Sequence, residues 1–320
     1  MLKPPQKIVS LLPSSTEIVC ALGLEEKLVG VTHECDYPGS VASKPHVTAS
    51  RISHETMSSK EIDHAVRSNL DGHGSIYELD ENLLQSLDPD LILTQELCDV
   101  CAVNYEMVTR AARIYAAGAK IVSLEPTTIK EIFENIETVG SVCETPQMAA
   151  DLTVTLQKRL DEIRATAANA ASRPGVFMLE WLEPPFAPGH WVPEQVEIAG
   201  GECLLGEAGK KSVTTTFERV HESNPEILVL IPCGYYIDDT LRQMRQTVFP
   251  EIVRDIEAVK NGNVWAVDAT SYFSRPGPRV VNGAEILAKI VHPELFGEPQ
   301  SLEAVRVPSD MFAFGAAGSA

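Results

Sequence analysis

The chain is poor in aromatic and in basic residues. Phe, Trp and Tyr make up 6% of its 320 residues, and 26 Lys and Arg stand against 45 Asp and Glu, for a formal net charge of -19. Because proteins hold nucleic-acid phosphates and anionic lipid headgroups through Lys and Arg, this balance argues against both kinds of partner. We therefore expect no nucleic-acid binding.

The chain also lacks long hydrophobic runs. No segment is apolar over the roughly 20 residues that a membrane-spanning helix needs. The N-terminus enters an apolar run at Ile8 without the leader and small-residue cleavage site of a secretory signal, although an exported chain trimmed of its signal would begin the same way. Seven scattered cysteines do not resemble a dense disulfide framework. We expect a cytoplasmic protein without membrane insertion.

Short apolar runs alternate with helical patterns along the chain, and 44% hydrophobic content over this length is enough for two cores. The strand-like runs are residues 8–12, 27–31, 90–94, 120–124, 176–179, 227–230 and 263–267. Such alternation predicts parallel strands connected by helical crossovers.

A long helix divides this pattern. Apolar residues recur at helical spacing, at Met148, Leu152, Leu156, Leu160 and Ile163. Thr145-Pro146 supplies an N-cap and a proline at the first helical position, and Arg173-Pro174 ends the pattern. The sequence therefore predicts two Rossmann-like α/β lobes joined by one long rigid helix, with bounds 1–144, 145–173 and 174–320.

The two halves resemble each other internally. Residues 86–93 and 222–229 both place a turn with proline before an apolar strand. Two related lobes with facing strand ends would hold a ligand in the crevice between them, which is where open α/β sheets bind ligands. Two α/β domains with unrelated sites are the alternative.

Several motifs together resemble one family. They are Pro13-Ser14-Ser15-Thr16-Glu17-Ile18-Val19, Asp36-Tyr37-Pro38, Asp88-Pro89-Asp90-Leu91-Ile92, the long helix, and Arg275-Pro276-Gly277-Pro278-Arg279. They are similar to the cobalamin-binding branch of the helical-backbone (class III) periplasmic-type substrate-binding proteins. The resemblance covers nearly the whole chain, and without an export signal the chain looks like a non-exported subgroup.

The resemblance implies a ligand and a partner. It implies two lobes on a rigid helix and a corrinoid such as cobalamin, or an iron chelate, between them. Exported members deliver their ligand to an ABC permease, so the implied protein partner is such a permease or a corrinoid-handling protein.

Thiols and an imidazole follow predicted first-lobe strands. Cys98 and Cys101 form a CxxC motif, and His33 and Cys35 follow an earlier strand. Any of these four side chains could bind cobalt or iron axially, and thiols at this spacing could also act as a redox pair or bind a soft metal. The alternatives are small buried structural cysteines and a loop histidine bonded to backbone.

Polar and aromatic side chains near predicted strand ends are the candidate ligand contacts, because a corrin ring with amide arms requires flat faces and hydrogen-bonding groups. In the first lobe they are Ser14, Ser15, Thr16, Glu17, Asp36, Tyr37 and Gln95; in the second they are Trp181, Phe186, His190, Trp191, Tyr235, Tyr272 and Arg275. The tryptophans could instead form a hydrophobic plug, and Arg275 could pair with an acidic neighbour.

Three classes of function remain. A binding protein for a corrinoid, haem or a siderophore is favoured, because no nucleophile, base and orienting group can be assembled from adjacent motifs, and neither a Gly-rich phosphate loop nor a metalloprotease helix is present. The alternatives are a thiol- or metal-dependent enzyme at Cys98 and Cys101, and a scaffold with a vestigial cleft.

Overall fold

The computed structural model describes residues 4–50, 52–53, 56–71, 77–95 and 118–315. The chain divides into two compact units. Unit 1 contains residues 1–53, 64–126 and 130–156, and unit 2 contains 54–63, 127–129 and 157–320.

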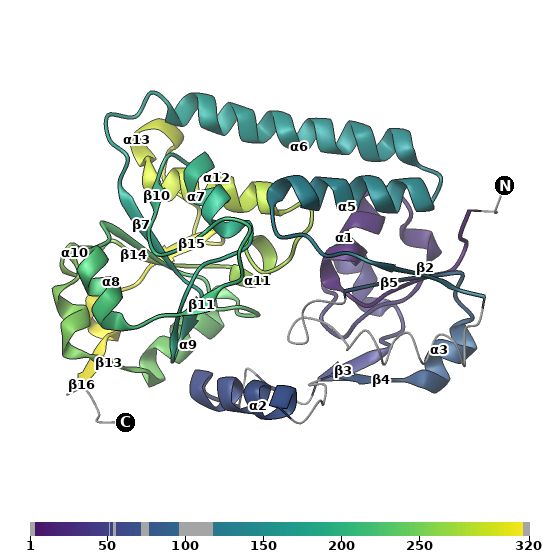
Figure 1. Cartoon of the computed structure of the whole chain (residues 1–320), viewed down its shortest axis with the longest axis horizontal. Helices are drawn as coiled ribbons and strands as arrows, with labels where there is room; N and C mark the ends of the chain where they lie inside the picture. The colour runs from purple at the N-terminus through teal and green to yellow at the C-terminus, as the bar shows by residue number, and fades with distance from the viewer. Residues whose placement is uncertain (1–3, 51, 54–55, 72–76, 96–117, 316–320) are drawn as a thin grey trace. The chain divides into compact units, whose positions relative to one another are not determined.

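Unit 1 is built on a parallel four-stranded sheet with the order β2-β1-β5-β6 (Figure 1). Its strands are β1 (Ile8–Ser10), β2 (Leu28–Gly30), β5 (Leu91–Thr94) and β6 (Lys120–Ser123), with an antiparallel pair β3 (Thr48–Ser50) and β4 (Tyr77–Leu79). Each main strand lies inside one of the predicted apolar runs. The central strands β1 and β5 are buried on both faces, as continuous apolar runs in parallel sheets are.

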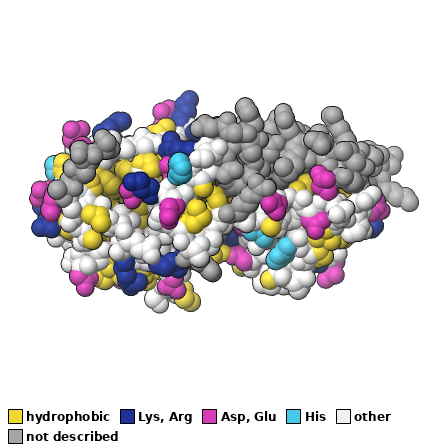
Figure 2. Space-filling model, turned by 90° about the horizontal axis from the view of Figure 1, so that it is seen from below, with side chains coloured by type: hydrophobic (Ala, Val, Ile, Leu, Met, Phe, Trp, Pro, Cys, Tyr) yellow, Lys and Arg dark blue, Asp and Glu magenta, His cyan; other side chains and the backbone are white. Residues whose placement is uncertain are grey.

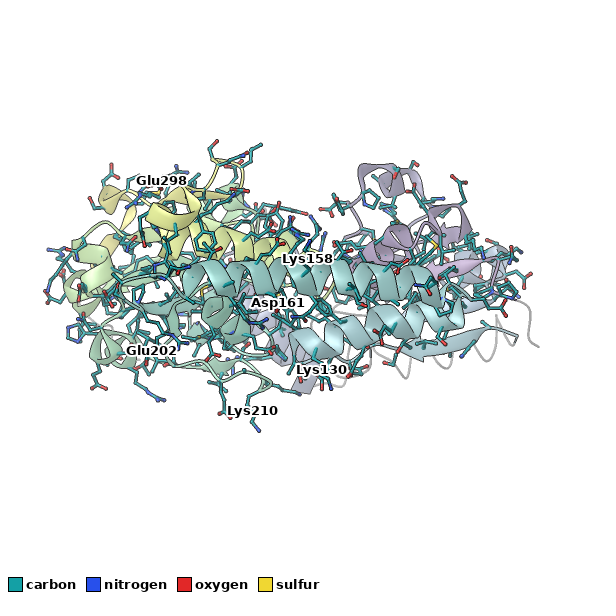
Figure 3. All side chains as sticks on the ribbon, turned by 90° about the horizontal axis from the view of Figure 1, so that it is seen from above. Lys130, Lys158, Asp161, Glu202, Lys210 and Glu298 are labelled. Atoms are coloured by element: carbon teal, nitrogen blue, oxygen red, sulfur yellow. The ribbon has the colours of Figure 1, made fainter. Side chains whose placement is uncertain are left out.

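Helices lie between and after these strands along the chain. They are α1 (Pro13–Ala21), α2 (Ser59–Asp71), α3 (Glu81–Leu87), α5 (Ile129–Val142) and α6 (Pro146–Ala167), with 3-10 turns at Glu25–Lys27 and Gly39–Ser43. Helices α5 and α6 run side by side in Figures 1 and 3. A β-carbon at Gly140 would overlap the side chain of Ala149, so glycine permits this close approach.

The long helix α6 ends at Ala167, six residues before the predicted end at 173. The Asn169 amide donates to the carbonyl oxygens of Ala165 and Thr166 at 3.0 and 3.1 Å, which satisfies carbonyls of the last turn and stops the helix. Charged residues line its exposed side, where Figure 3 labels Lys158 and Asp161.

Unit 2 is built on a five-stranded sheet with the order β10-β7-β12-β14-β15. Its strands are β7 (Gly175–Leu179), β10 (Glu202–Cys203), β12 (Ile227–Leu230), β14 (Val264–Val267) and β15 (Ala304–Arg306). All neighbours are parallel except β15, which is antiparallel to β14. The predicted parallel α/β architecture is therefore confirmed in both units.

Two small sheets that the sequence analysis did not predict complete unit 2. They are the antiparallel β8 (Trp181–Leu182), β9 (Pro185–Ala187) and β11 (Val213–Thr214), and the parallel pair β13 (Val248–Pro250) and β16 (Ala313–Gly315). Strands of two or three residues are too short to show an alternating apolar pattern.

The helices of unit 2 are α7 (Val192–Ile198), α8 (Phe217–Ser223), α9 (Ile237–Gln246), α10 (Glu257–Lys260), α11 (Ala269–Tyr272), α12 (Val280–Val291) and α13 (Pro293–Phe296), with 3-10 turns at Glu251–Asp255 and Ser309–Met311. Helix α7 packs on α12 (Figure 1). Among the described residues, no helix is both long and apolar enough to cross a membrane.

Short segments from the first half of the chain belong to unit 2. Residues 54–63 and 127–129 precede the long helix in sequence but group with unit 2. The boundary between the units also falls inside helices α2 and α6.

Candidate functional site

In each unit, candidate residues follow the carboxyl ends of parallel strands, which meet at one edge of a sheet. In unit 1, His33 follows β2 and Gln95 follows β5. In unit 2, Trp181 follows β7, Tyr235 follows β12 and Tyr272 follows β14. The topology thus gathers these candidates at one sheet edge within each unit.

The hydroxyl-rich turn after β1 is buried. Ser14, Ser15, Thr16 and Glu17 are at most 4% exposed. Ser10 Oγ lies 2.6 Å from Ser15 Oγ and 2.7 Å from Thr16 Oγ1. Because the Ser10, Ser15 and Thr16 hydroxyls bond to one another, they are satisfied within the β1–α1 junction.

The Cys35 thiol belongs to the same network. It is 3% exposed, and its Sγ lies 3.1 Å from Thr16 Oγ1 and 3.7 Å from Thr32 Oγ1. This is the placement of a structural cysteine.

His33 lies closer to the surface. Its Nδ1 is 2.7 Å from Thr48 Oγ1, and its ring centroid lies 5.5 Å from that of Tyr77 at a tilt of 48°. Its Nε2 is buried without a hydrogen-bond partner among the described residues. Burial and the neighbouring His46 lower the pKa of His33, and a hydrogen bond with Thr48 partly opposes them. The imidazole is thus neutral at neutral pH, which is the form that binds metals. Nε2 can reach a ligand only if the ring turns outward.

Tyr37 is the exposed aromatic residue among the candidates of unit 1. Its exposed fraction is 49%, and Asp36 beside it is also exposed. Gln95 is half-buried after β5. Figure 2 shows acidic and basic side chains interspersed over the part of one face that the structure describes.

Trp181 is the half-buried aromatic residue at the corresponding edge of unit 2. Its ring meets that of buried Tyr235 edge-on at 5.3 Å, and its Nε1 donates to the carbonyl oxygen of Ser59 at 3.2 Å. Part of the indole remains exposed beside this contact.

Trp191, one of the candidate ligand contacts, lies inside unit 2. It is 7% exposed, caps α7, and donates from Nε1 to the Phe273 carbonyl oxygen at 3.0 Å. Gln195 bonds the same segment, at the Tyr272 and Val280 carbonyls. We therefore assign Trp191 to packing. Its neighbours in sequence are Pro188, Gly189 and Pro193, so the local sequence does not indicate that this indole is buried.

His190 and Phe186 are half-buried near this small sheet. His190 has a positive φ of 53°, and its N–H donates to the Lys210 carbonyl at 2.6 Å. Burial and nearby Lys211 lower the pKa of His190. A side chain at Gly189 would overlap the backbone of Ser212, so the segment fits only glycine there.

The C-terminal candidates follow β14. Arg275 is buried in unit 2, with 7% of its surface exposed. Tyr272 is half-buried, and the guanidinium of Arg279 lies 5.8 Å from its ring.

Sequence reasoning missed Glu180. This carboxyl directly follows β7, where burial raises its pKa to about 7 and a hydrogen bond with Ser212 opposes the shift. The available signal was an acidic residue immediately after the apolar run of residues 176–179.

Two thiols of the described residues, Cys20 and Cys203, have pKa values raised by burial. Both pKa values are raised to about 12, which disfavours the nucleophilic thiolate. Cys98 and Cys101 lie outside the described residues. Within those that are described, no group of three or more His, Cys, Asp or Glu side chains is placed to hold a metal ion.

Comparison with known proteins gives relatives over most of the chain. The vitamin B12-binding protein of Vibrio cholerae serotype O1 is 24% identical over 285 residues, covering 88% of this chain and 87% of its own. An ABC transporter substrate-binding lipoprotein of Bacillus subtilis is 24% identical over 304 residues, covering 92% of this chain and 83% of its own.

The fold is shared with solved structures. A periplasmic heme-binding protein from Pseudomonas aeruginosa superposes with a TM-score of 0.70 at 20% identity, covering 95% of this chain and all of its own. The family described as periplasmic binding protein matches residues 8–270. The predicted resemblance is thus confirmed, and the chain belongs to the periplasmic binding protein family.

Proposed function

We propose that this chain, a substrate-binding protein of the ABC transporter type, binds a corrinoid such as cobalamin and passes it to a permease or to a corrinoid-handling protein. Members of its family bind solutes and are not enzymes. Binding is therefore the activity we propose, in preference to a thiol-dependent enzyme at Cys98 and Cys101, which lie outside the described residues.

The observation that carries the proposal is a partly exposed aromatic ring near a strand end in each unit. Tyr37 is 49% exposed in unit 1, and Trp181 is half-buried beside buried Tyr235 in unit 2. Flat apolar faces with a few polar groups suit a macrocycle that carries amide arms. The name of the Vibrio cholerae relative, which is similar over most of both chains, supports cobalamin in particular.

His33 is the residue that we propose as the axial ligand to the macrocycle's metal. Its lowered pKa keeps the imidazole neutral, and an outward turn of the ring, which releases the 2.7 Å contact between Nδ1 and Thr48 Oγ1, would bring Nε2 to a ligand. With the proton on Nδ1, Nε2 carries the free lone pair that metal ligation uses. Cys35 is a weaker candidate because its thiol is buried in the Thr16 network.

Haem or another iron chelate is the second candidate ligand. A neutral imidazole also suits haem iron. The fold likeness to a heme-binding protein is compatible with this ligand but carries no residue-level argument at 20% identity.

Equilibrium dialysis against aquocobalamin tests the proposal. We expect the parent chain to retain about one cobalamin per chain, and Trp181→Leu to retain less because it removes the partly exposed ring. Trp265→Phe is the matched control, since Trp265 is 4% exposed and lies under Arg306. Absence of retention by the folded parent chain would refute the proposal.

A further inference from the structure

The first turn of α2 is fixed on unit 2 by one buried amide. Gln243 on α9 is 2% exposed, and its Oε1 accepts from Ser59 N at 3.2 Å and from Ser59 Oγ at 3.4 Å. Its Nε2 donates to the Met57 carbonyl oxygen at 2.9 Å. A buried amide is costly unless it is paired, so these three bonds hold the turn in one place.

The same turn takes up the polar edge of Trp181. The Ser59 carbonyl accepts the indole N–H at 3.2 Å, while Tyr235, which is fully buried, packs against the ring. Ser59 is itself 2% exposed, so the acceptor side of this part-buried bond lies inside the protein. With its N–H satisfied inside the protein, Trp181 can offer a ligand only apolar ring surface.

We infer that the Met57–Ser59 turn, held by Gln243, is a positioning element that fixes the Trp181 indole for ligand contact, an inference that rests on the proposed function. The turn makes Trp181 select a flat apolar surface, such as the face of a macrocycle, over a hydrogen-bonding edge of the ligand. Ser59 and Gln243 act through Trp181 and do not themselves touch the ligand.

The experiment replaces Gln243 and follows Trp181 directly. The protein is labelled with 5-fluorotryptophan, so that the three tryptophans give separate fluorine resonances, and Trp181→Phe assigns the relevant one. In Gln243→Leu we expect the Trp181 resonance to broaden and move toward that of free indole. The buried Trp191 and Trp265 report whether unit 2 stays folded.

Matched variants separate positioning from general damage. Gln246→Leu makes the same change at an exposed position of the same helix and should leave all three resonances in place. Ser59→Pro removes both Ser59 bonds to Gln243 at the first position of α2, where proline is well tolerated. If Gln243→Leu perturbs all three resonances, Ser59→Pro is the variant that tests whether the turn positions Trp181.

Aquocobalamin affinity completes the test. We expect Gln243→Leu and Ser59→Pro to weaken binding by roughly three- to tenfold, which is the range for one misplaced aromatic contact. A Trp181 resonance that is unchanged in both variants overturns the inference, as does a moved resonance with unchanged affinity. If the parent chain binds no cobalamin, the proposed function fails, whereas the ligand-free resonances still report whether the turn positions Trp181.

Discussion

Asp88 and Asn224 adopt the same left-handed backbone conformation, with φ and ψ of 48° and 61° in one and 44° and 61° in the other. Asp88 ends α3 before β5, and Asn224 ends α8 before β12. Each is followed by a proline and a central strand of its sheet. The internal resemblance of segments 86–93 and 222–229 is therefore a repeated helix stop, in which Asn and Asp tolerate a conformation that other side chains avoid.

Substitutions at this helix stop should separate backbone strain from side-chain bonding. We expect Asp88→Ala to lower the free energy of unfolding by about 1 kcal/mol, and Asp88→Gly to leave it unchanged or raise it slightly. Asn224→Ala should lower the free energy of unfolding by about 1–2 kcal/mol, because it also removes two hydrogen bonds. Asn224 Nδ2 donates to the Glu257 carboxylate, and Asn224 Oδ1 accepts from the Glu257 backbone N–H. Urea unfolding measures all three, and equal costs for Asp88→Ala and Asp88→Gly would contradict the account.

Local sequence patterns were sufficient for the main strands of both sheets, because continuous apolar runs identify buried parallel strands. They were insufficient where long-range contacts decide the structure. Nothing near Trp181 indicates that its N–H meets Ser59, 122 residues earlier. The residues next to Trp191 likewise give no sign that its indole N–H donates to the Phe273 carbonyl oxygen, 82 residues later.

Substitutions of Trp181 and of Trp191 should therefore have different effects. Trp191→Ala should lower the free energy of unfolding by about 3–5 kcal/mol, because it empties a buried site. Trp181→Ala should instead weaken aquocobalamin binding by roughly 1–3 kcal/mol. Denaturant unfolding and equilibrium dialysis on both variants check this contrast. A large loss of stability in Trp181→Ala, together with a loss of affinity but not of stability in Trp191→Ala, would disprove it.

The buried carboxyl of Glu180 should make stability depend on pH. Its pKa is raised from 4.5 to about 7, so the folded state binds its proton more tightly than the unfolded state does. Stability from this group is complete below about pH 4.5 and is lost as pH rises toward 7, by up to about 3 kcal/mol. We expect the free energy of unfolding, measured with denaturant at pH 5 and at pH 8, to fall less between these two pH values in Glu180→Gln than in the parent chain.

Glu202→Gln is the control for that measurement, because Glu202 is exposed at the end of the same sheet (Figure 3). It should unfold with the pH dependence of the parent chain. If Glu180→Gln also keeps the parental dependence, Glu180 is ionised in the folded state and its assignment fails.

Axial ligation by His33 should be visible in the cobalt absorption bands. When the chain binds aquocobalamin, we expect the imidazole to displace the bound water and shift the bands, and His33→Ala to abolish the shift while leaving much of the affinity. Because the pKa of His33 is lowered, the shift should persist to a pH below the ordinary value of 6.5.

Cysteine variants and a second ligand complete this test. Cys35→Ala should leave the bands of bound aquocobalamin unchanged, because that thiol bonds Thr16. Cyanocobalamin, whose cyanide exchanges reluctantly, should bind without the shift. If His33→Ala, Cys35→Ala, Cys98→Ala and Cys101→Ala each keep the parental spectrum, none of these four side chains ligates the metal.

Calorimetric titration of the ligand-free chain with aquocobalamin and with haem, side by side, tests the central claim most directly. We predict saturable binding of about one aquocobalamin per chain with a Kd of about 1 μM or tighter, and haem binding at least roughly tenfold weaker. Tighter binding of haem, or no binding of aquocobalamin by a chain whose unfolding transition shows that it is folded, would contradict the assignment of a corrinoid ligand.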